Sequence, residues 1–85
     1  MKKIKYQVKT SQGIHARPAG LLVDEFSHFK CSVIIEKGGK AVNAKEIFPL
    51  MSLCIKKGDK IVITFEGEEE MAASKAAEKY FEENL

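Results

Sequence analysis

The stretch Lys3-Ile4-Lys5-Tyr6-Gln7-Val8-Lys9 alternates strictly between polar and apolar residues. Successive side chains of a β-strand point to opposite faces, so this pattern predicts a strand with one buried face and one wet, basic face. Residues 60–66 repeat the pattern, with Ile61, Ile63 and Phe65 on one side. Strands with one polar face are typical of an antiparallel sheet that is covered on one side only. The two stretches therefore predict a sheet whose second face is open to solvent.

The segments around these strands complete the predicted fold. Between them, Lys37-Gly38-Gly39-Lys40 favours a hairpin turn, because glycine accepts the positive φ angles that such turns require. A short helix can hold Pro49 only in its first turn, where no intrahelical N–H is lost. We expect helices at residues 16–29, 46–53 and 68–85 and strands at residues 31–36 and 41–44. The order β-α-β-β-α-β-α predicts an α+β fold, an open-faced β-sandwich in which three helices cover one side of a four-stranded antiparallel sheet.

Length and composition indicate one small domain spanning residues 1–85, with 45% hydrophobic residues to build one core. No apolar run approaches the ~18 residues that a membrane helix needs, and the charged N-terminus has no apolar stretch behind it. Cys31 and Cys54 lie far apart without a CxxC pattern, which argues against a disulfide framework and against a metal site. We expect a cytoplasmic protein without a cofactor, in which both cysteines are small buried hydrophobes.

The net charge of +2 conceals an uneven distribution. Residues 1–65 carry twelve Lys or Arg and five Asp or Glu, a surplus of seven positive charges. Residues 66–85 carry two Lys and seven Glu, a surplus of five negative charges. A basic body is compatible with nucleic acid, membrane headgroups, phosphorylated groups or acidic proteins, and composition alone does not choose among them.

The segment Gly13-Ile14-His15-Ala16-Arg17-Pro18-Ala19 joins the first strand to the first helix. His15 falls near the N-cap, and the backbone N–H groups of Ala16 and Arg17 lie at the positive end of the helix, where anions bind. The Arg17 guanidinium adds a permanent charge suited to phosphate. This field favours a neutral, nucleophilic imidazole. A lone histidine before a helix is usually an ordinary surface residue or an imperfect cap, and it is the combination of residues in this segment, together with the predicted fold, that favours the anion site.

This segment, together with Gly39-Lys40-Ala41-Val42-Asn43-Ala44-Lys45 and Met51-Ser52-Leu53, resembles the HPr family of bacterial histidine-containing phosphocarriers. The similarity covers essentially the whole chain and agrees with the predicted fold. It implies that His15 accepts a phosphoryl group on Nδ1 from enzyme I of the phosphoenolpyruvate:sugar phosphotransferase system, assisted by Arg17. It implies that the group then passes to sugar-specific IIA proteins. Such a protein is a stoichiometric carrier in sugar transport and not an enzyme.

The second helical segment is almost entirely apolar, and a short helix on one side of a sheet can bury only one stripe. Leu50, Leu53 and Cys54 form one possible buried set, which leaves Ile47, Phe48 and Met51 as an exposed apolar group. Such a group usually marks a protein contact, and methionine suits a surface that fits several partners. The alternative is that the whole helix is inserted into the core. The resemblance favours the contact and places Gly20 and Asp24 on the same docking side.

Glu46 departs from the family pattern, because many Gram-positive members carry there a serine that a dedicated kinase phosphorylates. A glutamate cannot accept that group. In the first turn of a helix its charge is favourable in itself. A second interpretation is that it permanently but only partly mimics phosphoserine, since it carries less charge and fewer acceptor oxygens.

Two further functions remain open at this stage. A regulatory adaptor of the same fold would bind partner proteins without phosphotransfer, but the pairing of His15 with Arg17 argues against it. A small nucleic-acid-binding domain would explain the basic body. However, the basic strand lacks interleaved aromatic residues, since Tyr6 is on its apolar face. The favoured expectation is a monomeric carrier that meets enzyme I, IIA proteins and regulatory proteins, and neither nucleic acid nor membrane.

Overall fold

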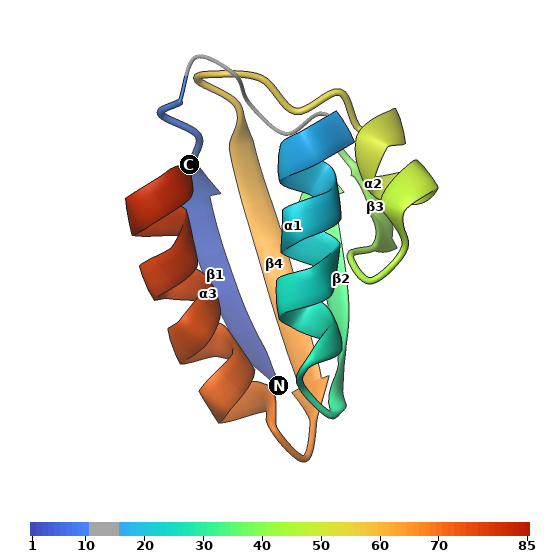
Figure 1. The fold of residues 1–85 in the computed structure, drawn as a ribbon, viewed down its shortest axis with the longest axis vertical. Helices are drawn as coiled ribbons and strands as arrows, with labels where there is room; N and C mark the ends of the chain where they lie inside the picture. Colours follow the sequence, from blue (N-terminus) through green and yellow to red (C-terminus); the bar gives the residue numbers. More distant parts are fainter. Residues whose placement is uncertain (11–15) are drawn as a thin grey trace.

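The computed structural model describes residues 1–10 and 16–85, with the backbone alone for residues 16–18 (Figure 1). The predicted order of elements is confirmed. The first helix ends two residues earlier than expected, and the last helix begins two residues later. The elements are β1 (Lys2–Gln7), α1 (Ala16–Ser27), β2 (Cys31–Lys37), β3 (Lys40–Asn43), α2 (Ile47–Ser52), β4 (Lys60–Gly67) and α3 (Glu70–Asn84).

The four strands form one antiparallel sheet in the order β1-β4-β2-β3. Ile63 in β4 is opposite Ile4 in β1 and Ile35 in β2, so apolar residues line up in a row across three strands. In Figure 1, α1 and α3 run over the same face of this sheet, and α2 packs beside α1 and β3. The fold is therefore the open-faced α+β sandwich that the alternating strands predict.

The core lies between the sheet and the helices and is organised around Phe26 of α1. This ring is fully buried and meets Phe65 of β4 edge to face at a centroid distance of 5.9 Å. It meets Phe81 of α3 at 6.4 Å in a nearly perpendicular arrangement. Tyr6 of β1 packs against Phe81 and donates its hydroxyl proton to the Phe81 carbonyl oxygen, at 2.9 Å. One aromatic cluster thus joins two helices to two strands.

The turn between β2 and β3 has the backbone that its sequence predicts. Gly38 and Gly39 have φ values of 57° and 85°. Two successive positive φ angles match the right-handed twist of the flanking strands, and residues with a Cβ rarely adopt them.

None of the helices within the described ranges is long and apolar enough to cross a membrane.

The expected burial of the cysteines is wrong. Cys54 is exposed and Cys31 is only half-buried. The prediction extended the helical spacing of Leu50 and Leu53 by one residue, but α2 ends at Ser52 and Leu53 is its C-cap. Beyond this point Cys54 takes a φ of 50°, so helical periodicity no longer decides where its side chain points.

Candidate functional site

The predicted junction lies where the chain enters α1. Gly13, Ile14 and His15 lie outside the described residues, and α1 begins at Ala16. The first four N–H groups of a helix have no intrahelical acceptor, so those of Ala16 and Arg17 need partners outside the helix. Pro18 is the third helical residue, where its missing N–H costs no helical bond. The first turn of α1 contains no acidic residue that would offset the positive end of the helix.

Residues 8–10, which follow β1 and lead toward this junction, are held by backbone hydrogen bonds to two distant segments. The Val8 N–H donates to the Asp59 carbonyl oxygen at 2.9 Å, and the Gly58 N–H donates to the Val8 carbonyl oxygen at 2.8 Å. The N–H groups of Lys9 and Thr10 both donate to the carbonyl oxygen of Leu85. No sequence pattern predicts these contacts, because they join residues about fifty or more positions apart.

The apolar residues of α2 divide between core and surface. Phe48 is 81% exposed, which excludes insertion of the whole helix into the core. Ile47 and Met51 are half-buried and pack against the core, so the group is less exposed than the sequence predicts. Leu50 and Leu53 are buried as expected.

The helix α1 contributes to the same side of the molecule. A Cβ placed on Gly20 would lie 3.6 Å from the Ile47 side chain, an ordinary contact distance, so Gly20 is where α1 and α2 approach each other. Asp24 is exposed one turn further along α1. Leu21 is 55% exposed, and sequence reasoning missed it. Its position off the stripe of buried residues could have indicated it. We call Gly20, Leu21, Asp24, Ile47, Phe48 and Met51 the α1–α2 face.

Glu46 is the N-cap of α2 and is not in its first turn, one position from where the sequence prediction placed it. Its backbone is extended and its side chain makes no capping hydrogen bond. Instead its carboxylate accepts a hydrogen bond from the Asn43 side-chain amide at 3.1 Å, and the Asn43 oxygen accepts one from the Lys45 N–H at 2.9 Å. The carboxylate is therefore exposed and points back toward the loop before α2.

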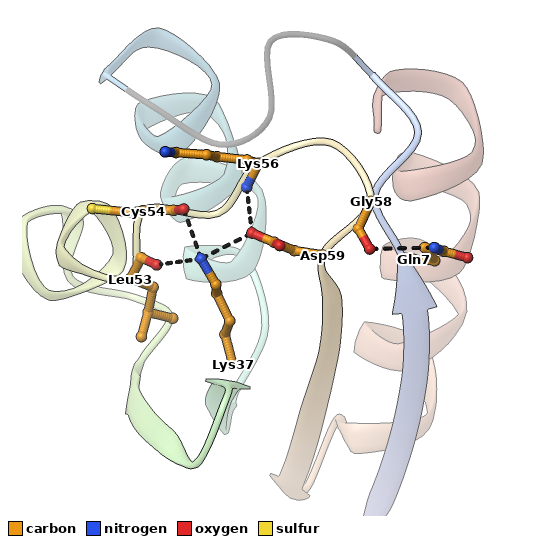
Figure 2. A network of polar contacts seen from close by, with 7 residues as sticks. All are labelled: Gln7, Lys37, Leu53, Cys54, Lys56, Gly58 and Asp59. Carbon is orange, nitrogen blue, oxygen red and sulfur yellow. Dashed lines mark hydrogen bonds and ion pairs between the residues drawn. The ribbon is translucent and has the colours of Figure 1, made fainter.

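A network of polar contacts lies between α2 and β4 (Figure 2). The Lys37 Nζ is 2.8 Å from the Asp59 carboxylate, which also accepts a hydrogen bond from the Lys56 N–H at 2.7 Å. These two hydrogen bonds, the one from Lys37 first, hold the pKa of the Asp59 carboxyl below its usual value. The network includes no residue that the sequence analysis singled out as functional.

Replacing Asp59 with Asn should flatten the acid limb of the stability curve. A carboxyl whose pKa is depressed in the folded state stabilises the protein above its unfolded pKa of about 3.9 and loses that contribution as the pH falls through the folded pKa. The melting temperature of the unmodified protein should therefore fall more steeply below about pH 4 than that of Asp59→Asn. Circular dichroism melts between about pH 2 and pH 7 measure this difference. Glu83→Gln removes an exposed carboxylate as a control, and parallel curves for Asp59→Asn and the unmodified protein would contradict the expectation.

Comparison with known proteins identifies relatives that share this fold and this sequence. The family model for the PTS HPr component phosphorylation site matches residues 2–83. The chain is 40% identical to the HPr-like protein Crh of Bacillus subtilis over 81 residues, which is 95% of each protein. It is 41% identical to the phosphocarrier protein HPr of Mycoplasma pneumoniae over 85 residues, 99% of this chain and 97% of that protein.

Solved structures agree with these sequence matches. The crystal structure of an HPr from Thermoanaerobacter tengcongensis has a TM-score of 0.92 at 39% identity, over 96% of this chain and 92% of that one. A dimer of HPr from the same organism has a TM-score of 0.77 at 38% identity, over 98% and 95% of the two chains.

The fold and the junction define a class of small open-faced α+β sandwiches that carry a histidine immediately before the first helix. The family model and the relatives, which match nearly the whole chain, identify one family within this class. The chain belongs to the HPr family, whose members are phosphocarrier proteins of the phosphotransferase system. The resemblance that the junction suggests is thereby confirmed, and the relatives include both HPr and HPr-like Crh proteins.

Proposed function

We propose that this chain is a phosphoryl carrier of the phosphoenolpyruvate:sugar phosphotransferase system. His15 accepts the phosphoryl group from enzyme I, and IIA proteins remove it for sugar uptake. The observation that carries the proposal is the place of His15 in the sequence, one residue before α1 begins at Ala16, together with a first turn of α1 that contains no acidic residue. The family to which the chain belongs supports the same assignment.

The chemistry of transfer needs little from the protein beyond this placement. A lone pair on Nδ1 of the neutral His15 imidazole forms the new bond to phosphorus, while the donor's bond to phosphorus breaks and its electron pair stays with the donor. The phosphoryl oxygens then face the N–H groups of Ala16 and Arg17 and the Arg17 charge. A charge at a helix terminus is stabilised by about 0.3–2 kcal/mol. That amount tunes a reversible transfer without trapping the group, as a carrier requires.

The direct test uses labelled phosphoenolpyruvate and enzyme I. We propose that residues 1–85 act as a monomeric domain in the cytoplasm, although a dimer is described for a related HPr, so light scattering should fix the molecular mass first. The chain should then take up about one phosphoryl group, in the acid-labile and base-stable linkage expected of a phosphohistidine. Omitting enzyme I should prevent labelling. Failure of the complete mixture to label the protein would overturn the proposal.

We propose that the α1–α2 face binds both enzyme I and the IIA proteins. It lies where α1 and α2 approach each other, and it presents the Phe48 ring to solvent. Burial of an exposed ring of this size against a partner removes apolar surface from water, which favours association. The mixture of a rigid ring with the flexible Met51 suits a surface that must accept more than one partner.

Phe48→Ser should weaken docking without weakening the fold. Burial of a phenylalanine side chain contributes about 1.5–3 kcal/mol, so we expect the KM for phosphorylation by enzyme I to rise about tenfold or more. The melting temperature should change little, because the ring is 81% exposed in the free protein. Met71→Ser removes a half-exposed apolar side chain from α3 and is the matched control. Equal KM values for the two variants would exclude Phe48 from the docking contact.

A regulatory adaptor that does not transfer phosphate is the second candidate, favoured by the similarity to Crh, an HPr-like protein. We propose that Glu46 occupies the regulatory position of the family and cannot be phosphorylated there. Its exposed carboxylate next to α2 adds a fixed negative charge at the edge of the α1–α2 face. A protein that binds partners but takes up no label from enzyme I would favour this candidate.

A further inference from the structure

The C-terminal end of α2 is a short turn that continues into Leu53 and Cys54. The helix has only six residues, and the last four carbonyl groups of any helix have no intrahelical donor. The chain leaves it through Leu53 and Cys54, whose N–H groups donate back to Leu50 and Met51 at 3.2 and 3.1 Å. Among the loop and cap contacts of the described residues, no backbone N–H donates to the carbonyl groups of Leu53 and Cys54.

Lys37 supplies donors to these carbonyl groups from the end of β2. Its Nζ donates to the Leu53 carbonyl oxygen at 3.1 Å and to the Cys54 carbonyl oxygen at 2.8 Å (Figure 2). The third partner is the Asp59 carboxylate at 2.8 Å. An ammonium group has three N–H donors, so these three acceptors satisfy it completely.

Asp59 holds Lys37 in place and links it to β4. Its carboxylate also accepts the Lys56 N–H, so the connection between α2 and β4 is bonded at both of its ends. The side chains of Lys37 and Asp59 are only 27% and 29% exposed. A partly buried pair with several hydrogen bonds is ordered more firmly than a pair on the open surface.

The residue that Lys37 secures is in a backbone conformation that it would not adopt alone. Cys54 has a φ of 50°, which an L-residue other than glycine rarely takes. Such a residue persists only where surrounding contacts determine its conformation. Figure 2 shows its sulfur pointing away from Lys37, so the backbone carbonyl alone makes the contact.

We infer that Lys37 is a positioning residue for docking, which holds the C-terminal end of α2 and thereby sets the orientation of Phe48 on the α1–α2 face. The inference rests on the proposed function, because docking of phosphotransferase proteins is what the orientation serves. Lys37 touches no reacting atom in this scheme and acts only through α2.

The test compares Lys37→Met with Lys60→Met. Both remove one positive charge and keep an unbranched stem, but Lys60 is an exposed residue at the start of β4. In Lys37→Met, amide hydrogen exchange at Leu53 and Cys54 should accelerate at least tenfold. The KM for phosphorylation by enzyme I should rise about fivefold with kcat unchanged. Lys60→Met should leave the exchange unchanged and shift KM by less than twofold.

Two further variants test how Lys37 acts. The first separates the lysine's hydrogen-bond donors from its charge, and the second tests the backbone conformation of Cys54. In the swapped pair, Lys37→Asp with Asp59→Lys, an ion pair is kept but a carboxylate faces the two carbonyl groups. Amide hydrogen exchange at Leu53 and Cys54 should therefore stay fast, and the KM should stay raised. Cys54→Gly in the Lys37→Met background removes the conformational cost at position 54 and should restore at least half of the lost protection.

Each outcome decides a separate claim. Unchanged amide exchange in Lys37→Met would overturn the inference, and so would faster exchange with a KM equal to that of Lys60→Met. A raised KM in the swapped pair, Lys37→Asp with Asp59→Lys, supports the role of the lysine's donors. A KM equal to that of the unmodified protein in the swapped pair would overturn that role. If the unmodified protein takes up no label, the proposed function fails and the docking role fails with it, whereas the exchange data still show whether Lys37 holds α2.

Discussion

His15→Ala should abolish labelling by phosphoenolpyruvate and enzyme I, to less than about 1% of the unmodified protein. An alanine side chain has no lone pair with which to attack phosphorus, and backbone N–H groups at the start of a helix can bind an anion but cannot hold it covalently. The loss is therefore expected to be complete and not partial. Counting the acid-labile label in the purified variant measures it directly.

His28→Ala is the matched control for this experiment. His28 is exposed and follows the last residue of α1, at the opposite end of that helix from His15. The same side chain is removed at both positions, and in His28→Ala the label should remain at about one group per chain. Label retained in His15→Ala, or lost in His28→Ala, would assign the phosphoryl group to a different residue. Both variants should melt at nearly the temperature of the unmodified protein.

Phe26→Ala should have the largest effect on stability. The side chain is fully buried and its ring contacts Phe65 and Phe81, so no water can fill the space that it leaves without meeting apolar walls. Removal of a buried phenylalanine costs about 3–5 kcal/mol, against a total of about 5–15 kcal/mol for a typical domain. We expect the unfolding midpoint in urea to fall steeply while the slope of the transition stays constant.

Leu21→Ala on the same helix is the comparison. Leu21 is 55% exposed, and its truncation should change the free energy of unfolding by about 0.5 kcal/mol or less. A loss below about 1 kcal/mol in Phe26→Ala would mean that the aromatic cluster does not organise the core. The two variants together separate the buried and exposed faces of α1.

The fold could be predicted because strict local patterns dominate this sequence. The alternation around Ile4 and Ile63 and the Gly38-Gly39 turn each depend on neighbouring residues only, so reading them in order gives the sheet and its open face. The predicted ends of the helices are less accurate than the predicted order of the elements. Glu68 and Glu69 have the composition of a helix, but Gly67 has a φ of 142° and the turn continues to Glu69 before α3 begins.

The candidate site also has a part that the sequence predicts and a part that it does not. The start of α1 directly after His15 and the exposure of Phe48 follow from short-range rules, namely the placement of proline in a first turn and the narrow buried stripe of a short helix. The contacts of Lys37 could not be predicted. They join the ends of β2 and α2 to the start of β4, and a lysine next to a glycine turn has no pattern that identifies its partner.

The strand order β1-β4-β2-β3 has a consequence for how the chain reaches this structure. Within the described sheet β1 pairs with β4 alone, and its first pair joins Lys2 to Phe65, so β1 has no sheet partner until residues about sixty positions later have been made. Closing so long a loop costs entropy before any contact offsets it, and topologies rich in such contacts fold in milliseconds to seconds. Synthesis therefore gives α1 and the β2–β3 hairpin no complete sheet to pack on. The sheet can be completed only once β4 has been made, because β4 lies between β1 and β2 and also carries the Phe65 ring that Phe26 contacts.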